Sequence, residues 1–145
     1  MRINFARAIL AGIAGTLVMT AVGLWLAPMM GIPRMNPAEM LSQQMGGNVA
    51  LGWAAHFMIG SILAVVYAPV SSRLAGPFPV RGAFYGIAPF LLAQIVVMPM
   101  MGMPLFSGST SMAMGSLLGH LIYGAVVGAL YGAGALVASR RVVTA

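Results

Sequence analysis

Residues 49–70 read VALGWAAHFMIGSILAVVYAPV, a continuous apolar stretch that contains one histidine, His56. An α-helix rises about 1.5 Å per residue, so about 20 apolar residues are enough to cross the hydrocarbon core of a bilayer. A membrane-spanning β-strand would be shorter and would alternate apolar with polar residues. The stretch therefore predicts a membrane-spanning helix with a histidine inside it.

Three more stretches of this kind occur, and the four expected spans cover about residues 7–27, 49–70, 82–100 and 113–138. The composition agrees, because 61% of the residues are hydrophobic and only 6% are charged. Soluble domains carry about 25% charged residues. We expect a single all-α membrane domain over residues 1–145, an integral four-helix bundle in contact with the lipid bilayer.

The second half of the chain repeats the pattern of the first. The sequence PMMGIP at residues 28–33 returns as PMMGMP at residues 99–104. The spans that follow these motifs carry matching residues at matching intervals, namely Gly52, His56, Gly60, Ala64 and Tyr67 in the first half and Ser116, His120, Gly124, Gly128 and Tyr131 in the second. The sequence predicts two tandem two-helix repeats, over about residues 7–70 and 81–138.

The arginines are distributed unevenly between the expected loops. Six of them lie before the first span, between the second and third, or after the fourth: Arg2, Arg7, Arg73, Arg81, Arg140 and Arg141. Because positively charged loops stay in the cytoplasm, this distribution predicts cytoplasmic N- and C-termini in a multi-pass protein of the bacterial inner membrane. Topology thus explains the net charge of +6, and we expect no nucleic-acid partner.

A short helix is expected in the first outer loop. Asn36 is a typical N-cap residue, Pro37 suits the first helical position, and Glu39 suits the first turn. Gly46-Gly47 would end the helix. We predict an interfacial helix over about residues 37–45.

The sequence lacks the residues that most enzyme classes need. It contains no cysteine, and Glu39 is its only acidic residue. Thiol chemistry and catalysis by paired carboxylates are therefore excluded. We expect a non-enzymatic protein.

The only histidines, His56 and His120, each belong to a ridge of small residues spaced four apart on one helix face. Such ridges face other helices rather than lipid, so both imidazoles should lie inside the bundle. An ionisable residue within a membrane span marks a candidate functional site. The leading hypothesis is an accessory or binding subunit that holds haem or a copper ion between the two histidines near the outer face.

Two cofactors suit this hypothesis. Histidine is a common ligand of haem iron, and Gly60 and Gly124 would let a haem b macrocycle lie against the helix backbone. Cu(I) instead favours imidazole combined with thioether sulfur. Eleven of the 14 methionines lie towards the expected outer side, and Met30 and Met101 are the additional candidate ligands.

Two further interpretations stay open. The histidines could line a polar path in a small transporter or channel, although proton relays normally also use acidic residues, which these spans lack. Alternatively, the small ridges only let helices pack closely in a purely structural subunit. Exposed ridges would also suit a homo-oligomer or docking on a larger membrane complex.

The fourth span carries a glycine-rich pattern, Gly119-His120-Leu121-Ile122-Tyr123-Gly124, followed by Tyr131-Gly132. With this pattern the whole chain resembles small four-helix bacterial membrane proteins of unknown function. The resemblance implies a four-helix fold and no particular activity.

Overall fold

The computed structural model describes residues 3–143, with side chains described up to Ala133. All secondary structure in this part of the chain is helical. Four helices are long and apolar enough to cross a membrane: Phe5–Met29, Val49–Val70, Phe78–Met100 and Thr110–Ala133. The predicted all-α class and the four spans are thus confirmed. Arg2 and the side chains of Arg140 and Arg141, on which the topology prediction partly rests, lie outside the described residues.

In chain order the elements are α1 (Phe5–Ala21), η1 (Val22–Leu26), α2 (Ala27–Met29), α3 (Pro37–Gln43), α4 (Val49–Val70), α5 (Phe78–Leu92), η2 (Ala93–Val97), α6 (Met98–Met100), η3 (Leu105–Gly108) and α7 (Thr110–Val143). Of these, η1 and η2 are single π-helical turns and η3 is a 3₁₀ turn. The first span therefore consists of α1, η1 and α2, and the third consists of α5, η2 and α6.

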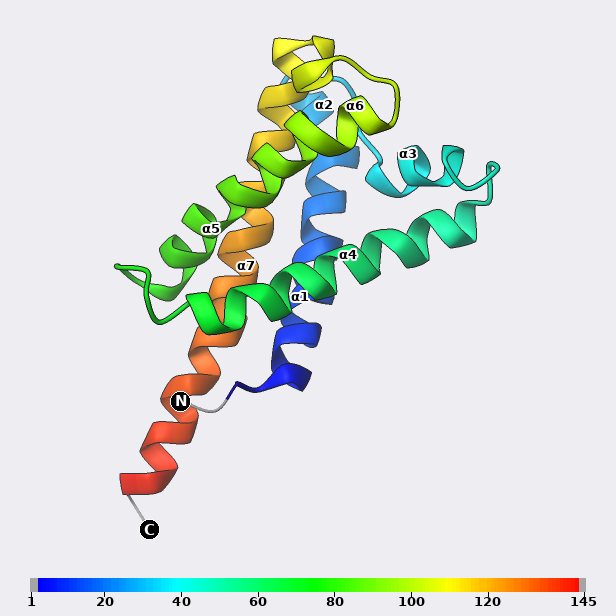
Figure 1. Ribbon diagram of the computed structural model, residues 1–145. Helices are drawn as coiled ribbons and strands as arrows, with labels where there is room; N and C mark the ends of the chain where they lie inside the picture. The colour runs from blue at the N-terminus through cyan, green and yellow to red at the C-terminus, as the bar shows by residue number, and fades with distance from the viewer. Residues whose placement is uncertain (1–2, 144–145) are drawn as a thin grey trace.

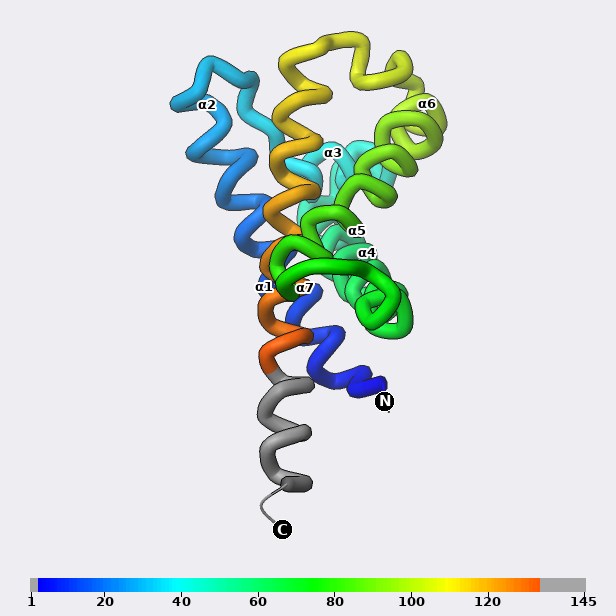
Figure 2. The backbone as a smooth tube through the Cα atoms, turned by 90° about the vertical axis from the view of Figure 1, so that its left-hand side faces the viewer, coloured from blue at the N-terminus to red at the C-terminus, as the bar shows by residue number. Residues whose placement is uncertain are grey.

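The spans pack in a chain of contacts. α4 crosses α1, α1 contacts α7, and α5 packs along α7 (Figures 1 and 2). α2 and α6 both lie at the upper end of the molecule in the two views, beside the loops that follow them; we call this the loop end. The start of α1 and the loop between α4 and α5 lie away from the loop end.

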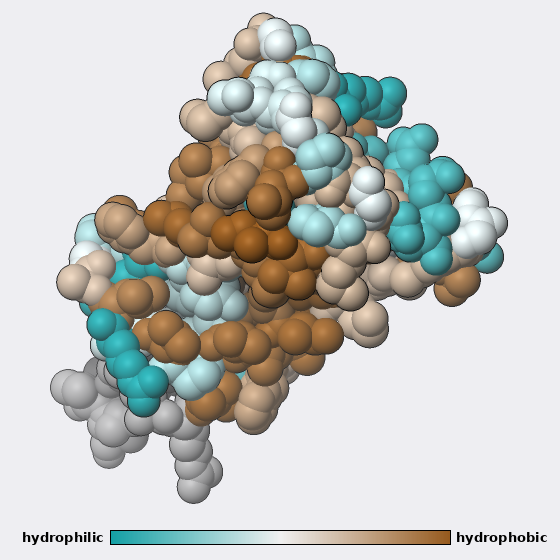
Figure 3. Space-filling model, turned by 45° about the horizontal axis from the view of Figure 1, so that its top comes forward, coloured by the Kyte–Doolittle hydropathy of each residue, from teal (hydrophilic) through white to brown (hydrophobic). Residues whose placement is uncertain are grey.

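The outward-facing side chains of the spans are largely apolar. Leu10, Trp25 and Phe84 are all more than 60% exposed. Hydrophobic groups cover the middle of the face shown in Figure 3, and hydrophilic groups gather over α3. Because a large exposed apolar surface marks contact with a membrane or a partner, these helices contact lipid in a membrane-embedded protein.

Glycine allows α5 and α7 to approach each other at backbone distance. A Cβ atom at Gly124 would meet the carbonyl oxygen of Gly82, and one at Gly86 would meet the carbonyl oxygen of His120. Close approach of this kind is the usual role of small residues in membrane helices. The α5–α7 pair therefore depends on the absence of side chains at these positions.

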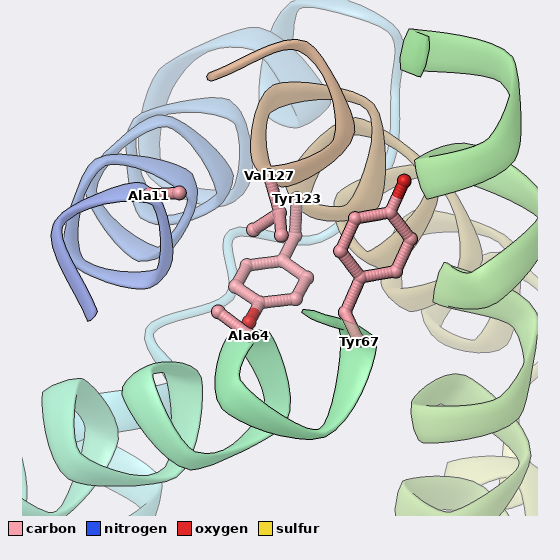
Figure 4. Close-up of a cluster of buried hydrophobic side chains, with 5 residues drawn as sticks. All are labelled: Ala11, Ala64, Tyr67, Tyr123 and Val127. Atoms are coloured by element: carbon pink, nitrogen blue, oxygen red, sulfur yellow. The ribbon is translucent and has the colours of Figure 1, made fainter. Parts of the chain in front are cut away.

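A close backbone approach at glycine also joins α1 and α4, and tyrosine side chains connect this pair to α7. A Cβ atom at Gly12 would lie 2.7 Å from the carbonyl oxygen of Gly60. The Tyr123 hydroxyl donates a hydrogen bond to that same carbonyl over 2.5 Å. Around it lies the buried core shared by the three helices, drawn in Figure 4: Ala11, Ala64, Tyr67, Tyr123 and Val127.

Each PMMG motif ends its span in a Schellman turn. Gly31 has φ +76° and Gly102 has φ +79°, values that favour glycine. In the first motif the Ile32 N–H donates to the Ala27 carbonyl over 3.0 Å, and the Gly31 N–H donates to the carbonyl of the next residue, Pro28, over 3.1 Å. The second motif forms the same pair of bonds. Helix termination therefore explains the motif.

A π-helical turn precedes the proline of each motif. Ala27 N–H donates to the carbonyl of Val22, and Met98 N–H donates to that of Ala93, in both cases five residues earlier. A proline ring clashes with the carbonyl four residues before it, and the wider turn relieves this clash. Such turns are frequent at functional sites, and both lie beside the cavity described below.

α3 occupies residues within the range expected for the short loop helix. Its N-cap is Asn36, whose side-chain oxygen accepts a hydrogen bond from the Glu39 N–H over 3.3 Å. α3 packs on the start of α4, where a Cβ atom at Gly52 would meet the carbonyl oxygen of Ala38. This contact holds α3 next to the loop end of the bundle.

Candidate functional site

A cavity of about 200 Å³ lies between α1, α4, α5 and α7, towards the loop end. Its polar lining includes Thr16, His56, Gln94, Ser107, Ser116 and His120. Six methionines also line it: Met19, Met35, Met40, Met98, Met101 and Met112. The structure thus brings the two histidines, which are 64 positions apart in the chain (120 − 56), to one cavity.

His56 is almost completely buried, with 7% of its surface exposed. Its Nε2 lies 3.0 Å from the Thr20 hydroxyl oxygen. That hydroxyl is 2.7 Å from the Thr16 carbonyl oxygen, to which it donates its single proton. The hydroxyl oxygen must then accept from His56, so this network places the proton of the neutral imidazole on Nε2 and the lone pair on Nδ1.

His120 has the opposite arrangement. Its Nδ1 lies 2.8 Å from the Ser116 carbonyl oxygen, one helical turn earlier. A carbonyl only accepts hydrogen bonds, so Nδ1 carries the proton and Nε2 holds the lone pair in the neutral ring. The Phe90 ring meets the imidazole edge-on, with centroids 6.0 Å apart. The two histidines are equivalent in the sequence pattern but not in hydrogen bonding.

Gln94 connects the His120 helix to the loop end. Its side-chain N–H donates to the Ser116 hydroxyl over 3.0 Å, and its carbonyl oxygen accepts from the Ser107 hydroxyl over 3.0 Å. Only 2% of its surface is exposed. Gln94 is the only carboxamide within the spans, which marks it in the sequence. Nothing in the sequence distinguishes Ser107 from the other serines of its loop.

The other candidate residues from the sequence have different surroundings. Gly60 lines the cavity and also packs against the side chain of Thr16. Gly124 is not among the lining residues and packs against α5 instead. Met101 lines the cavity, whereas Met30 is 60% exposed at the end of its span.

Two other methionines pack on α7 near the stretch that carries His120. A Cβ atom at Gly119 would lie 3.3 Å from Met19 Cγ, and one at Gly115 would lie 3.7 Å from Met35 Sδ. Both thioether side chains therefore cover the stretch of α7 that carries the histidine. The sequence pattern did not select them, because this contact joins α1 and the first outer loop to the fourth span.

The chemistry available here is limited to imidazole, thioether, hydroxyl and amide groups. Among the described residues, no group of three or more His, Cys, Asp or Glu side chains could hold a metal ion. No arginine or acidic residue lines the cavity in this part of the chain either. A metal at this site would therefore have the two imidazoles as its strongest ligands, with thioether, hydroxyl or amide groups to complete its coordination.

No curated protein and no solved structure matches this chain. A family model matches residues 3–141, nearly the whole sequence. The four apolar helices agree with the resemblance to small membrane proteins. The chain is a multi-pass membrane protein that belongs to the family of unknown function DUF6789.

Proposed function

We propose that this protein is a non-enzymatic binding subunit that holds a Cu(I) ion in the cavity lined by His56 and His120. The observation that carries the proposal is the composition of the cavity wall. Among the described residues, two histidines and six methionines line the cavity, and no acidic residue does. Thioether and imidazole ligands select Cu(I), whereas carboxylates and water suit harder cations. A monovalent ion also suits an apolar site without a countercharge.

His120 is the best-placed imidazole ligand. Its Nδ1–H is held by the Ser116 carbonyl, so the Nε2 lone pair is the one left for a metal. Hydrogen bonding at the second nitrogen commonly orients a metal-ligating histidine. Met19, Met35 and Met101 line the same cavity and can supply thioether ligands. His56 can ligate through Nδ1 while its Nε2–H stays bonded to Thr20.

Haem is less well supported than copper. An apolar cavity of about 150 Å³ holds one benzene molecule, and a porphyrin is several times larger than benzene. The present cavity measures about 200 Å³. The sequence pattern suggested that Gly124 contacts the macrocycle, but the backbone of Gly82 fills the space beside Gly124.

Transport is also less well supported. The lining residues extend from the loop end only as far as Thr16, Leu63, Pro89 and Tyr123. Beyond them lies the buried core of α1, α4 and α7 (Figure 4). A cavity that ends on a packed core favours holding a ligand over conducting one.

We also propose that the chain arose by tandem duplication and that both of its termini lie in the cytoplasm. Both first helices of the predicted repeats pass through a π-helical turn into a glycine Schellman turn, which supports a common origin. Arg7, Arg73 and Arg81 lie in segments away from the loop end. The positive-inside rule then places the cavity on the outer side of a bacterial inner membrane, where docking on a larger complex would deliver or receive the ion.

The test is an anaerobic Cu(I) titration of the purified protein in detergent, against a coloured Cu(I) chelator. We expect one Cu(I) per chain in the wild type, lost in His120→Ala and weakened in His56→Ala. Met30→Leu is the matched control, because this exposed methionine does not line the cavity. Failure of the wild type to compete for Cu(I) would refute the proposal, and a Soret band after reconstitution with haem would favour the alternative cofactor.

A further inference from the structure

Two loops at the loop end contribute Met35 and Ser107 to the cavity lining, and they are attached in different ways. In the first loop, the Met35 backbone N–H donates to the Gly23 carbonyl over 3.1 Å. In the second, Leu105–Gly108 has one hydrogen bond to another span within the described chain, from the Ser107 hydroxyl to Gln94. The second loop is therefore held by a side-chain hydrogen bond, which can break without the loss of any backbone hydrogen bond.

The second loop is also held in an unfavourable backbone conformation. Phe106 has φ +54° and Ser107 has φ +60°, in the left-handed region that residues with a Cβ atom rarely adopt. Such residues persist only where their surroundings hold them, and they occur at ligand clamps and switch regions. Release of the Ser107 hydroxyl would therefore also release backbone strain.

Two lines of contact run from this loop to His120. The polar line passes from Ser107 through Gln94 to Ser116, whose carbonyl holds the imidazole. The aromatic line passes from Phe106 to Phe90, with centroids 6.3 Å apart, and from Phe90 to His120. Movement of the loop would thus alter the surroundings of His120 through both lines of contact.

We infer that Leu105–Gly108 is a gate over the loop end of the cavity, latched by the hydrogen bond between Ser107 and Gln94. The inference rests on the proposed function in that a stored ion needs a controlled route to the aqueous side. Opening breaks the latch, relaxes Phe106 and Ser107, and frees the Gln94 carboxamide that bonds to Ser116. Entry of a ligand and the orientation of His120 are in this way coupled.

The test uses the absence of cysteine from the sequence. A single thiol is introduced behind the gate by Thr16→Cys, a buried position that lines the cavity. Its reaction with a positively charged, water-soluble methanethiosulfonate is followed in detergent without metal, because this reagent does not enter from the apolar side. Met112→Cys, which also lines the cavity, is the second reporter if Thr16→Cys does not fold.

Ser107→Ala in this background should raise the labelling rate about fivefold, the effect of losing one ordinary hydrogen bond. Ser107→Gly should raise the rate less than Ser107→Ala, because glycine also lacks the hydroxyl but adopts the left-handed conformation of the closed loop without strain. The matched control is Ser109→Ala, since the Ser109 hydroxyl bonds to Ser111 and to the Met112 N–H and not to Gln94. Its labelling rate should equal that of the background.

Equal rates in all four proteins, or an equal increase in Ser109→Ala, would overturn the gate. The result is independent of copper. If the Ser107 variants label faster but the wild type binds no Cu(I), the gate stands and the proposed function fails. If the wild type binds Cu(I) and the labelling rates do not change, the gate alone fails.

Discussion

One added methyl group at Gly124 should destabilise the protein, whereas the same group at Gly119 should not. Both residues are buried on α7, so Gly→Ala gives both the same gain in helix propensity, about 1 kcal/mol. A Cβ atom at Gly124 would lie 2.8 Å from the Gly82 carbonyl carbon and 3.1 Å from the Gly86 nitrogen, besides meeting the Gly82 oxygen. All of these are backbone atoms of α5, which can only yield by moving the whole helix.

The Gly119 methyl group meets a different neighbour. It would lie 3.3 Å from Met19 Cγ and 3.5 Å from Met19 Cε, atoms of a flexible side chain that can adjust. Overpacking against an unyielding neighbour costs about 1–3 kcal/mol. We therefore expect the free energy of unfolding of Gly124→Ala to lie about 1–3 kcal/mol below that of Gly119→Ala.

The assay is unfolding in mixed micelles by titration with sodium dodecyl sulfate, followed by far-ultraviolet circular dichroism. Equal stability of the two variants would refute the packing argument. A Gly124→Ala variant that is fully stable but loses its ligand would indicate instead that this glycine contacts a cofactor, as the sequence pattern allowed.

The remaining predictions concern single groups and use the same unfolding titration. Tyr123→Phe should lower the free energy of unfolding by about 0.6 kcal/mol, the mean for hydrogen bonds between membrane helices, because its bond to Gly60 is lost. Tyr67→Phe should leave stability unchanged or raise it, since the buried Tyr67 hydroxyl has no hydrogen-bond partner among the described residues. A marked loss would reveal an internal water or ligand at that hydroxyl. Gly102→Ala should cost about 1 kcal/mol because its φ is +79°, and Gly102→Asn should recover part of this loss; equal stability of all three proteins would contradict the assigned turn.

Much of the fold could be predicted because burial in lipid is a property of one continuous stretch of chain. Each span needs only its own length and apolarity, and its backbone hydrogen bonds are satisfied within the same helix. The α3 N-cap is equally local, since Asn36 acts on a residue three positions away. The PMMG motif was the exception. Its repetition was visible and suggested Met30 and Met101 as ligands, but the backbone role of the motif was not predicted: a π-turn precedes its proline and its glycine ends the helix.

The sequence by itself determined the four membrane helices, the two histidines within them and the restricted chemistry of a chain with no cysteine and one acidic residue. Tertiary structure decided how the histidines differ, because Thr20 on α1 fixes one ring and the backbone of Ser116 fixes the other. It also decided which methionines line the cavity and that Gly124 faces a helix. These properties depend on which faces of distant helices meet, and that is settled by the packing of all spans together rather than by the pattern along any one of them.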